Sequence, residues 1–320
     1  MKKMKEKNLA RFTQTLVDAL QAENRFSTAA HYSSAVRNYL LFIGQKSPGA
    51  AGRAENVGID ALSQDNIAAF NRYLLNKGLA PNTVSFYNRV LRAIWNKAVR
   101  AALVPRGAAN PFEGVYTGNW RTCKRAIAPE AIQDLSALDA AGLQPQMSAA
   151  RDIFLFSFYT MGMSFVDIAH LRRTNLDGDT IRYTRRKTGQ QMCVKIIPEI
   201  RSLLDRNDTG GEYLFPLIRS GSTPGQAYAQ YASALTGYNR HLKKLGEMAG
   251  GIGRISSYTA RHSWATIARD RDIPVAVISQ ALGHTSEKTT RTYLADIDFR
   301  ELDKANRLVA AEISACSDSL

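Results

Sequence analysis

Apolar residues recur at helical spacing through most of the first hundred positions of the chain. Windows in which they return every three to four residues predict amphipathic helices, and capping serines or terminating glycines stand at several window ends. The helices predicted from this pattern cover residues 8–22, 27–42, 64–76 and 82–100. The expected N-caps are Ser27 and Ser63, and the expected stops are Gly44 and Gly78.

The last of these helices has two faces of different character. Val84, Leu91 and Ile94 contribute to an apolar face, which is expected to pack into a core. The opposite stripe is polar or basic and consists of Ser85, Arg89, Arg92, Asn96 and Arg100. Such a stripe can lie along a DNA groove and contact phosphates and base edges. The alternative is an ordinary solvated helix face.

The pattern changes after residue 104. Residues 105–124 contain proline and glycine and show little periodicity, which predicts an interdomain linker. The end of this linker is basic, with Arg121, Lys124 and Arg125. We therefore expect a first domain over residues 1–104 and a second over residues 125–320.

The second domain combines helical and strand patterns. The segments Ile181–Arg185 and Met192–Ile197 are β-rich, and Lys187-Thr-Gly189-Gln stands between them, which predicts a β-hairpin. The rest is expected to be mainly helical. Helices are predicted over residues 129–141, 149–161 and 274–282, with an amphipathic one over residues 299–313.

The composition favours a polyanionic partner. The formal net charge is +14 and the pI is near 9.8, a balance for which nucleic acid is the commonest partner. The charge is concentrated in the first 120 residues, which hold 16 Lys and Arg against 7 Asp and Glu. This distribution suits a DNA-gripping domain that precedes a catalytic one.

Other composition features narrow the class of protein. The three cysteines lie far apart without a Cys-x-x-Cys pair, and the five histidines are scattered. No stretch approaches the roughly 20 apolar residues that span a bilayer. We therefore expect a cytoplasmic protein with no metal, no cofactor and no membrane partner, and a metal-dependent nuclease is disfavoured.

Arg261, His284 and Tyr293 follow one another in contexts that suit phosphoryl transfer. Arginine and histidine can hold and neutralise a phosphate and tyrosine can attack it, so a DNA backbone can be broken and rejoined without a metal. Arg261 can give bidentate hydrogen bonds to phosphate oxygens. His284 follows a glycine expected to end a helix, so it should project from a turn. For each residue alone, the alternative is an ordinary structural role.

These residues carry a resemblance to the tyrosine recombinase (phage integrase) family. The similar segments are Tyr258-Thr-Ala-Arg261-His262-Ser-Trp264, Leu282-Gly283-His284, and Tyr293 nine residues later. The resemblance implies a mainly α chain of two domains. These are an N-terminal four-helix core-binding (SAM-like) domain and a mainly helical catalytic domain with a small antiparallel β-sheet.

The resemblance also implies a role for each residue. Tyr293 would attack the scissile phosphate and form a 3′-phosphotyrosine, while Arg261 and His284 contact that phosphate. Lys187, at the hairpin turn, would protonate the leaving 5′ oxygen. Arg185 and Arg186 beside it would contact DNA, with a merely basic hairpin as the alternative.

Two positions depart from the family pattern. Tyr258 occupies a slot that usually holds His or Lys, and a phenol can still donate a hydrogen bond. Ser164, in Met161-Gly-Met-Ser164-Phe, occupies the slot of an arginine that holds the phosphate. Another cation would have to replace that arginine. Arg151, Arg172 and Arg173 are near in sequence, and the sequence does not choose among them.

The function expected from the resemblance is that of a site-specific DNA recombinase. The first core-type helix begins near Asn8, which favours a simple DNA invertase or small mobile-element recombinase over an integrase with an arm-binding domain. The expected partners are double-stranded DNA with paired recombination sites and further copies of the chain, a dimer on each site and a tetramer in synapsis. The C-terminal helix would dock in cis or in trans.

Three other functions remain as alternatives. A degenerate recombinase acting as a DNA-binding protein is kept open by Ser164. A type IB topoisomerase would use similar chemistry without paired sites. A helix-turn-helix repressor would explain basic helices but leaves the series Arg261, His284 and Tyr293 unexplained.

Overall fold

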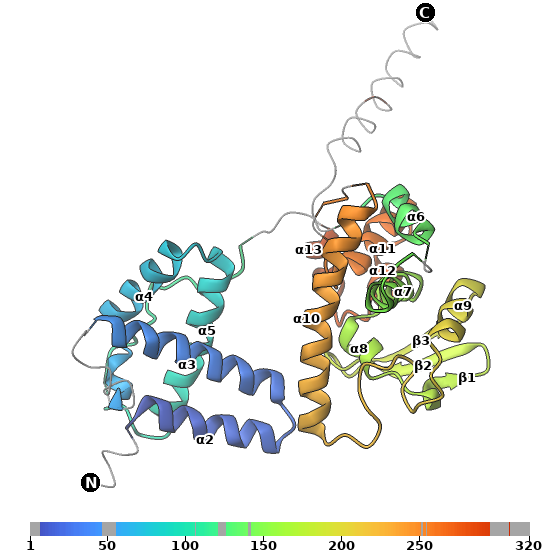
Figure 1. Cartoon of the computed structure of the whole chain (residues 1–320). Helices are drawn as coiled ribbons and strands as arrows, with labels where there is room; N and C mark the ends of the chain where they lie inside the picture. Colours follow the sequence, from blue (N-terminus) through green and yellow to red (C-terminus); the bar gives the residue numbers. More distant parts are fainter. Residues whose placement is uncertain are drawn as a thin grey trace, which may run out of the picture. The chain divides into compact units, whose positions relative to one another are not determined.

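The computed structural model describes residues 7–46, 56–105, 107–120, 126–139, 142–250, 252–253, 255–294 and 307, without the side chains of Lys46, Thr292 and Tyr293. The chain divides into two compact units, Met1–Cys123 and Lys124–Leu320 (Figure 1). Each unit has its own hydrophobic core. The predicted helix 299–313 lies outside the described residues apart from Arg307.

The described residues of unit 1 form a bundle of four helices. They are α2 (Leu9–Ala22), α3 (Phe26–Lys46), α4 (Gln64–Asn76) and α5 (Pro81–Arg100), with the short 3-10 helix η2 (Ile59–Ala61) before α4. Helix α3 packs against α2, α4 and α5, and aromatic rings at these contacts fill the core. The Tyr39 and Phe70 rings meet edge to face at 5.2 Å.

The N-cap predicted at Ser63 is confirmed, whereas Asn8, predicted as the first residue of its helix, is the N-cap of α2. Asn8 Oδ1 accepts from Arg11 N at 2.9 Å, and Ser63 Oγ accepts from Asn66 N at 3.3 Å. After α4, Gly78 takes a φ of +77°, a conformation that ends helices and suits glycine.

The predicted bounds of α3 are wrong at both ends. The helix begins at Phe26, which makes Ser27 an interior residue, and it continues through Gly44 to Lys46. A helical glycine costs only about 1 kcal/mol relative to alanine. The buried Phe42 ring packs on Phe70 and Tyr73 in this last part of α3, and we attribute the continuation of the helix to that packing.

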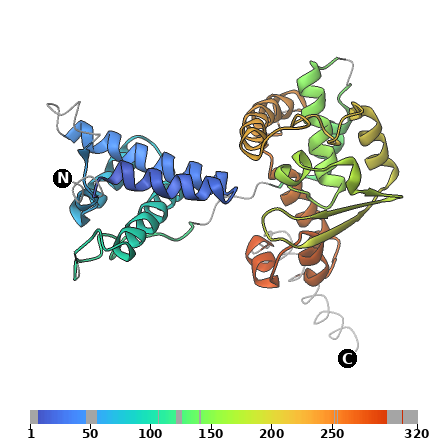
Figure 2. The ribbon, with the colours of Figure 1, turned by 90° about the horizontal axis from the view of Figure 1, so that it is seen from below.

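Unit 2 is built around α7, which is buried on every side of its central turns and contacts α6, α8, α9, α10 and α11 (Figure 2). The helices are α6 (Pro129–Ala137), α7 (Pro145–Tyr159), α8 (Phe165–Ala169), α9 (Pro198–Asn207), α10 (Pro224–Met248), α11 (Thr259–Asp270), α12 (Val275–Ala281) and α13 (Glu287–Leu294), with the 3-10 helix η3 (Arg173–Asn175). A helix that is buried on every side belongs in the core of a domain, and the charged residues of α7, Arg151 and Asp152, pair with each other there.

The predicted hairpin is present and carries a third strand. Strands β1 (Leu176–Asp177), β2 (Thr180–Thr184) and β3 (Gln191–Lys195) form an antiparallel sheet in the order β1-β2-β3. Tyr183 pairs with Met192, and alternate side chains of β2 and β3 are buried. The expected mainly α fold with a small antiparallel sheet is confirmed; β1 was not predicted.

Two helices of unit 2 differ from the predicted ranges. Helix α6 ends at Ala137, because Leu138 adopts an extended conformation and its carbonyl accepts from the buried guanidinium of Arg151. Helix α7 begins earlier than predicted, with Pro145 in its first turn, where a missing N–H costs nothing.

Part of the expected linker packs on unit 1. Phe112 lies in the core of that unit, and Val115 packs against it. Residues 121–125 lie outside the described residues. In the described part of the chain, no helix is long and apolar enough to cross a membrane.

Candidate active site

Arg261 stands at the centre of the site, in the first turn of α11, and is 4% exposed. Its Nη1 donates to the carbonyl of Gly162 at 2.8 Å, and its Nη2 donates to the carbonyl of Leu282. Gly162 has a φ of +76°, and a Cβ there would lie 2.8 Å from Arg261 Cα. The turn after α7 must therefore have glycine at this position for α11 to pack against it.

His284 reaches the same point from the turn that ends α12. His284 N donates to Ser279 O and Gly283 N to Gln280 O, a Schellman motif with Gly283 at a φ of +61°. His284 Nε2 lies 3.3 Å from Arg261 Nη2. Burial, and after it the charges of Arg261, Arg185 and Lys187, lower the pKa of His284 to about 4. The imidazole is therefore neutral near pH 7.

Arg185, directly after β2, is the second buried arginine of the site and is 7% exposed. Its Nη1 donates to the carbonyl of Gly283. A Cβ on Gly283 would lie 2.8 Å from Met192 Sδ and 3.0 Å from Arg185 Cδ. The hairpin and the turn bearing His284 are thus in direct contact, and this contact places the Arg185 guanidinium beside His284.

The hairpin turn presents its remaining cations to solvent. Arg185 N donates to Gln190 O and Gly189 N to Arg185 O, both at 2.8 Å, which closes the turn. Arg186 and Lys187 are exposed. Lys187 is close enough for its charge to act on His284. This arrangement leaves the Lys187 ammonium accessible to a ligand that approaches the site.

Ser164, at the position where the family has an arginine, is hydrogen-bonded to a neighbouring carboxylate. Its Oγ donates to Asp167 Oδ2 at 2.6 Å, and the other oxygen of this buried carboxylate accepts from Arg186 N at 2.9 Å. The pair ties the start of α8 to the hairpin. Ser164 therefore has a structural contact that does not require a phosphate.

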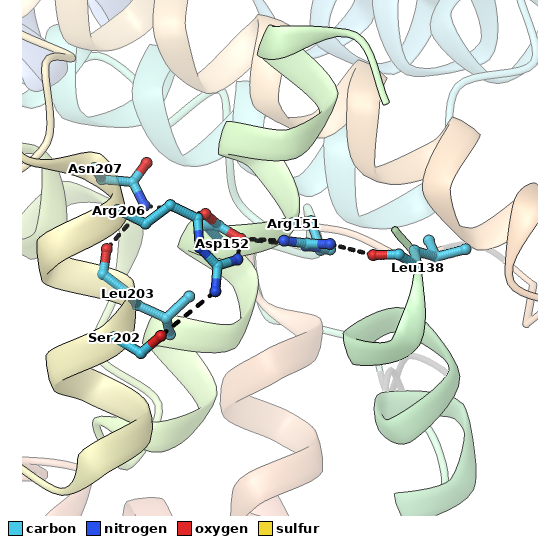
Figure 3. A network of polar contacts seen from close by, with 7 residues as sticks. All are labelled: Leu138, Arg151, Asp152, Ser202, Leu203, Arg206 and Asn207. Carbon is cyan, nitrogen blue, oxygen red and sulfur yellow. Dashed lines mark hydrogen bonds and ion pairs between the residues drawn. The ribbon is translucent and has the colours of Figure 1, made fainter. Parts of the chain in front are cut away.

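The three arginines considered as replacements are held elsewhere. Arg151 lies in a network around the buried Asp152, with Arg151 Nη2 and Arg206 Nη1 at 2.9 and 3.1 Å from Asp152 Oδ1 (Figure 3). Arg172 pairs with Glu212, and Arg173 pairs with Asp208. These contacts join α7 to α9 and brace η3, so none of the three is directed to His284.

Sequence profiles of known families match both units. The profile of the phage integrase family matches residues 130–299, and that of the phage integrase SAM-like domain matches residues 8–113. The chain belongs to the phage integrase family. It is an enzyme of the tyrosine-type site-specific recombinase class.

Curated members of the family align over much of the chain. A tyrosine recombinase of Pseudothermotoga lettingae is 23% identical over 314 residues, which are 94% of this chain and 99% of the relative. Tyrosine recombinase XerC of a Roseiflexus species is 24% identical over 240 residues, which are 72% of this chain and 74% of the relative.

Solved integrase structures share the fold. The Tn1549 transposon integrase in complex with transposon right end DNA has a TM-score of 0.58 at 13% identity, with 95% of this chain and 99% of that one covered. A lambda integrase dimer bound to a COC′ core site has a TM-score of 0.55 at 15% identity, with 90% and 77% covered.

Of the two candidate tyrosines in this integrase-family chain, the structure describes the side chain of Tyr258 and not that of Tyr293. Tyr258 is 45% exposed at the N-cap of α11, with its ring 6.4 Å from that of His262. Tyr293 belongs to α13, and its side chain lies outside the described residues. One turn before it, Thr290 Oγ1 lies 2.8 Å from His284 Nδ1. Thr290 was not among the residues predicted from the sequence, although its position one helical turn before Tyr293 was a usable signal.

The polar stripe of α5 is partly covered by the chain itself. The segment Tyr116–Trp120, here called the strap, lies along the start of this stripe. Ser85 is 2% exposed and donates to Gly118 O, and Arg89 Nη1 donates to Asn119 Oδ1 at 2.7 Å. Arg92 is half-buried, and Asn96 and Arg100 are exposed. Of the stripe predicted to contact DNA, Ser85 is therefore buried and Arg89 is bonded to the strap.

Proposed function

We propose that this chain cleaves and rejoins DNA through a 3′-phosphotyrosine intermediate. The Tyr293 phenol would release its proton and its Oη would bond to phosphorus while the bond from phosphorus to the 5′ oxygen breaks. In the rejoining step, the 5′ hydroxyl of a partner strand would attack that phosphorus and release Tyr293. The observation that carries the proposal is the meeting of Arg261 and His284, 23 residues apart in sequence, at 3.3 Å.

The charges of the site suit this step. A phosphodiester gains negative charge as tyrosine attacks, and buried, preorganised donors stabilise that charge more than solvated ones do. Arg261 is buried and fixed by two carbonyls. Lys187, accessible on the hairpin turn, would give its proton to the leaving 5′ oxygen.

In the family pattern an arginine that holds the phosphate stands at the position of Ser164, and we assign the role of this arginine to Arg185. It is buried and bonded to Gly283 O, next to His284, and its charge acts on that imidazole. A guanidinium has five N–H donors, so it can hold Gly283 and a phosphate oxygen together. Ser164 would serve the site only by keeping Asp167 against the hairpin.

The partner we propose is double-stranded DNA with paired recombination sites, bound by a dimer at each site and a tetramer in synapsis. The net charge of +14 supports a DNA partner. Related structures include a lambda integrase dimer on a core site and a tetramer on a Holliday junction. The proposed subtype is a DNA invertase or small mobile-element recombinase.

Ser164 also supports a second candidate function, a degenerate recombinase that only binds DNA. Covalent trapping separates the two. The chain is mixed with labelled DNA from around its own gene in EDTA and then denatured, in parallel with Tyr293→Phe. A labelled protein band that disappears in the variant supports the proposal. Binding of the same DNA without a band supports the degenerate protein, and a band that survives Tyr293→Phe means another nucleophile.

A further inference from the structure

Helix α13 brings a buried hydroxyl to the site in addition to the proposed nucleophile. Thr290 is fully buried, and its Oγ1 lies 2.8 Å from His284 Nδ1. The neighbouring Thr289 is exposed, and its hydroxyl lies 3.2 Å from Ser286 Oγ. Two adjacent threonines therefore have different surroundings, and only the buried one contacts the site.

The contacts of His284 determine which nitrogen carries its proton. Arg261 Nη2 lies 3.3 Å from Nε2, and a guanidinium can only donate. Nε2 therefore accepts, and in the neutral ring the hydrogen is on Nδ1, where it is donated to Thr290 Oγ1. The DNA-free protein thus holds His284 with its acceptor side toward Arg261.

Contact with a scissile phosphate requires Nε2 to donate a hydrogen bond instead of accepting one. If Thr290 continues to accept the Nδ1 hydrogen, the ring must then bind a second proton from solvent and become an imidazolium. The charged groups that act on His284 are Arg261 from α11 and Arg185 and Lys187 from the hairpin, all cationic. They oppose this protonation until the negative charge of the phosphate offsets them.

We propose that Thr290 is a positioning residue, which accepts the Nδ1 hydrogen of His284 in both states and so orients Nε2 toward the scissile phosphate. The proposal rests on the proposed function and deepens it. Because Thr290 and Tyr293 share one helix, the same hydrogen bond also holds the helix of the nucleophile against the phosphate site. A hydrogen bond to a charged donor is stronger than one to a neutral donor, so Thr290 favours the imidazolium.

The test compares Thr290→Val, which removes the hydroxyl, with Thr290→Ser, which keeps it, and Thr289→Val as the matched control. Single-turnover adduct formation is measured on nicked DNA from pH 5 to 9, together with DNA affinity and thermal stability. We expect Thr290→Val to slow the reaction about tenfold at neutral pH. The alkaline limb of its rate–pH profile should move about half to one pH unit lower. The reason is that an imidazolium without the Thr290 hydrogen bond is less stable and loses its proton at a lower pH. Thr290→Ser should restore both, and Thr289→Val should match the wild type.

Three results would overturn the inference. One is a Thr290→Val protein that is folded and has the wild-type pH profile. Another is a serine variant as defective as the valine variant. The third comes from ¹⁵N NMR of His284 in the DNA-free wild type, where the Nε2–H tautomer would contradict the assignment. This readout needs no catalysis, so an absence of adducts in the wild type would count against the proposed function and leave the inference testable.

Discussion

Replacing Arg185 by alanine should slow covalent attachment to DNA by about 10²–10³-fold. Removing one preorganised donor to a developing charge costs about 3–4 kcal/mol, and Arg185 is buried beside His284. The same change leaves the buried carbonyl of Gly283 without this donor, which costs about 1–3 kcal/mol of folding free energy. Rates must therefore be measured alongside urea unfolding of each variant.

Arg185→Lys separates the charge of the side chain from its geometry. An ammonium is a compact point charge that lacks the planar fork of the guanidinium. We expect it to hold either Gly283 O or a phosphate oxygen, and the rate to fall between those of wild type and alanine. Arg182→Ala is the matched control, since Arg182 lies on β2 three residues before Arg185 and pairs with Asp177 in solvent. It should leave both stability and rate unchanged.

The assay is single-turnover attachment to nicked, labelled DNA at saturating protein. Saturation removes differences in DNA affinity, and unfolding curves give the folded fraction at the assay temperature. A folded Arg185→Ala protein that reacts within threefold of wild type would refute the assignment. A loss that only follows the unfolded fraction would do the same, because Arg185 would then act as a brace for Gly283 alone.

Three further changes test other parts of the site. Lys187→Ala should slow cleavage of ordinary DNA and recover on a substrate with a better leaving group than the 5′ oxygen; without that recovery, Lys187 is not the acid. Gly162→Ala should lower the free energy of unfolding by about 2–4 kcal/mol, because the left-handed φ and the close backbone of Arg261 both oppose a Cβ; chemical denaturation at wild-type stability would contradict this packing. Arg92→Ala should weaken DNA binding and reduce its log–log salt slope by about one, while Ser85→Ala should change neither; equal effects in fluorescence anisotropy would mean that DNA reaches Ser85.

Local chemistry made part of the fold predictable. The cap at Ser63 and the stop at Gly78 act within one helical turn, so they can be recognised in the sequence. The hairpin around Lys187 was visible because alternating strands and a turn signal are close in sequence. Such features need no knowledge of what packs against them.

Tertiary contacts determined what the sequence analysis missed. Gly44 was predicted to end a helix because glycine is a poor helix former. Helix α3 nevertheless continues through it, where Phe42 joins the core of unit 1. Ser85 belongs to a polar stripe by spacing, but the strap lies 33 residues further along the chain and covers it. Arg185 was assigned to DNA as one of three adjacent cations. Only the structure distinguishes its buried guanidinium from the exposed Arg186.

The carbonyl groups around the buried guanidiniums of Arg261 and Arg185 suggest why Ser164 is compatible with an active enzyme. Backbone carbonyls near the C-terminal ends of α7 and α12 accept from the two guanidiniums: Gly162 O and Leu282 O from Arg261, and Gly283 O from Arg185. Helix C-termini carry partial negative charge and leave carbonyls without helical partners, so they stabilise cations before any phosphate arrives. The hairpin brings Arg185 to the turn after α12. If Arg185 holds the phosphate as proposed, the position after α7 does not have to supply a second arginine. Ser164 can then bind Asp167 and keep the base of that hairpin in place.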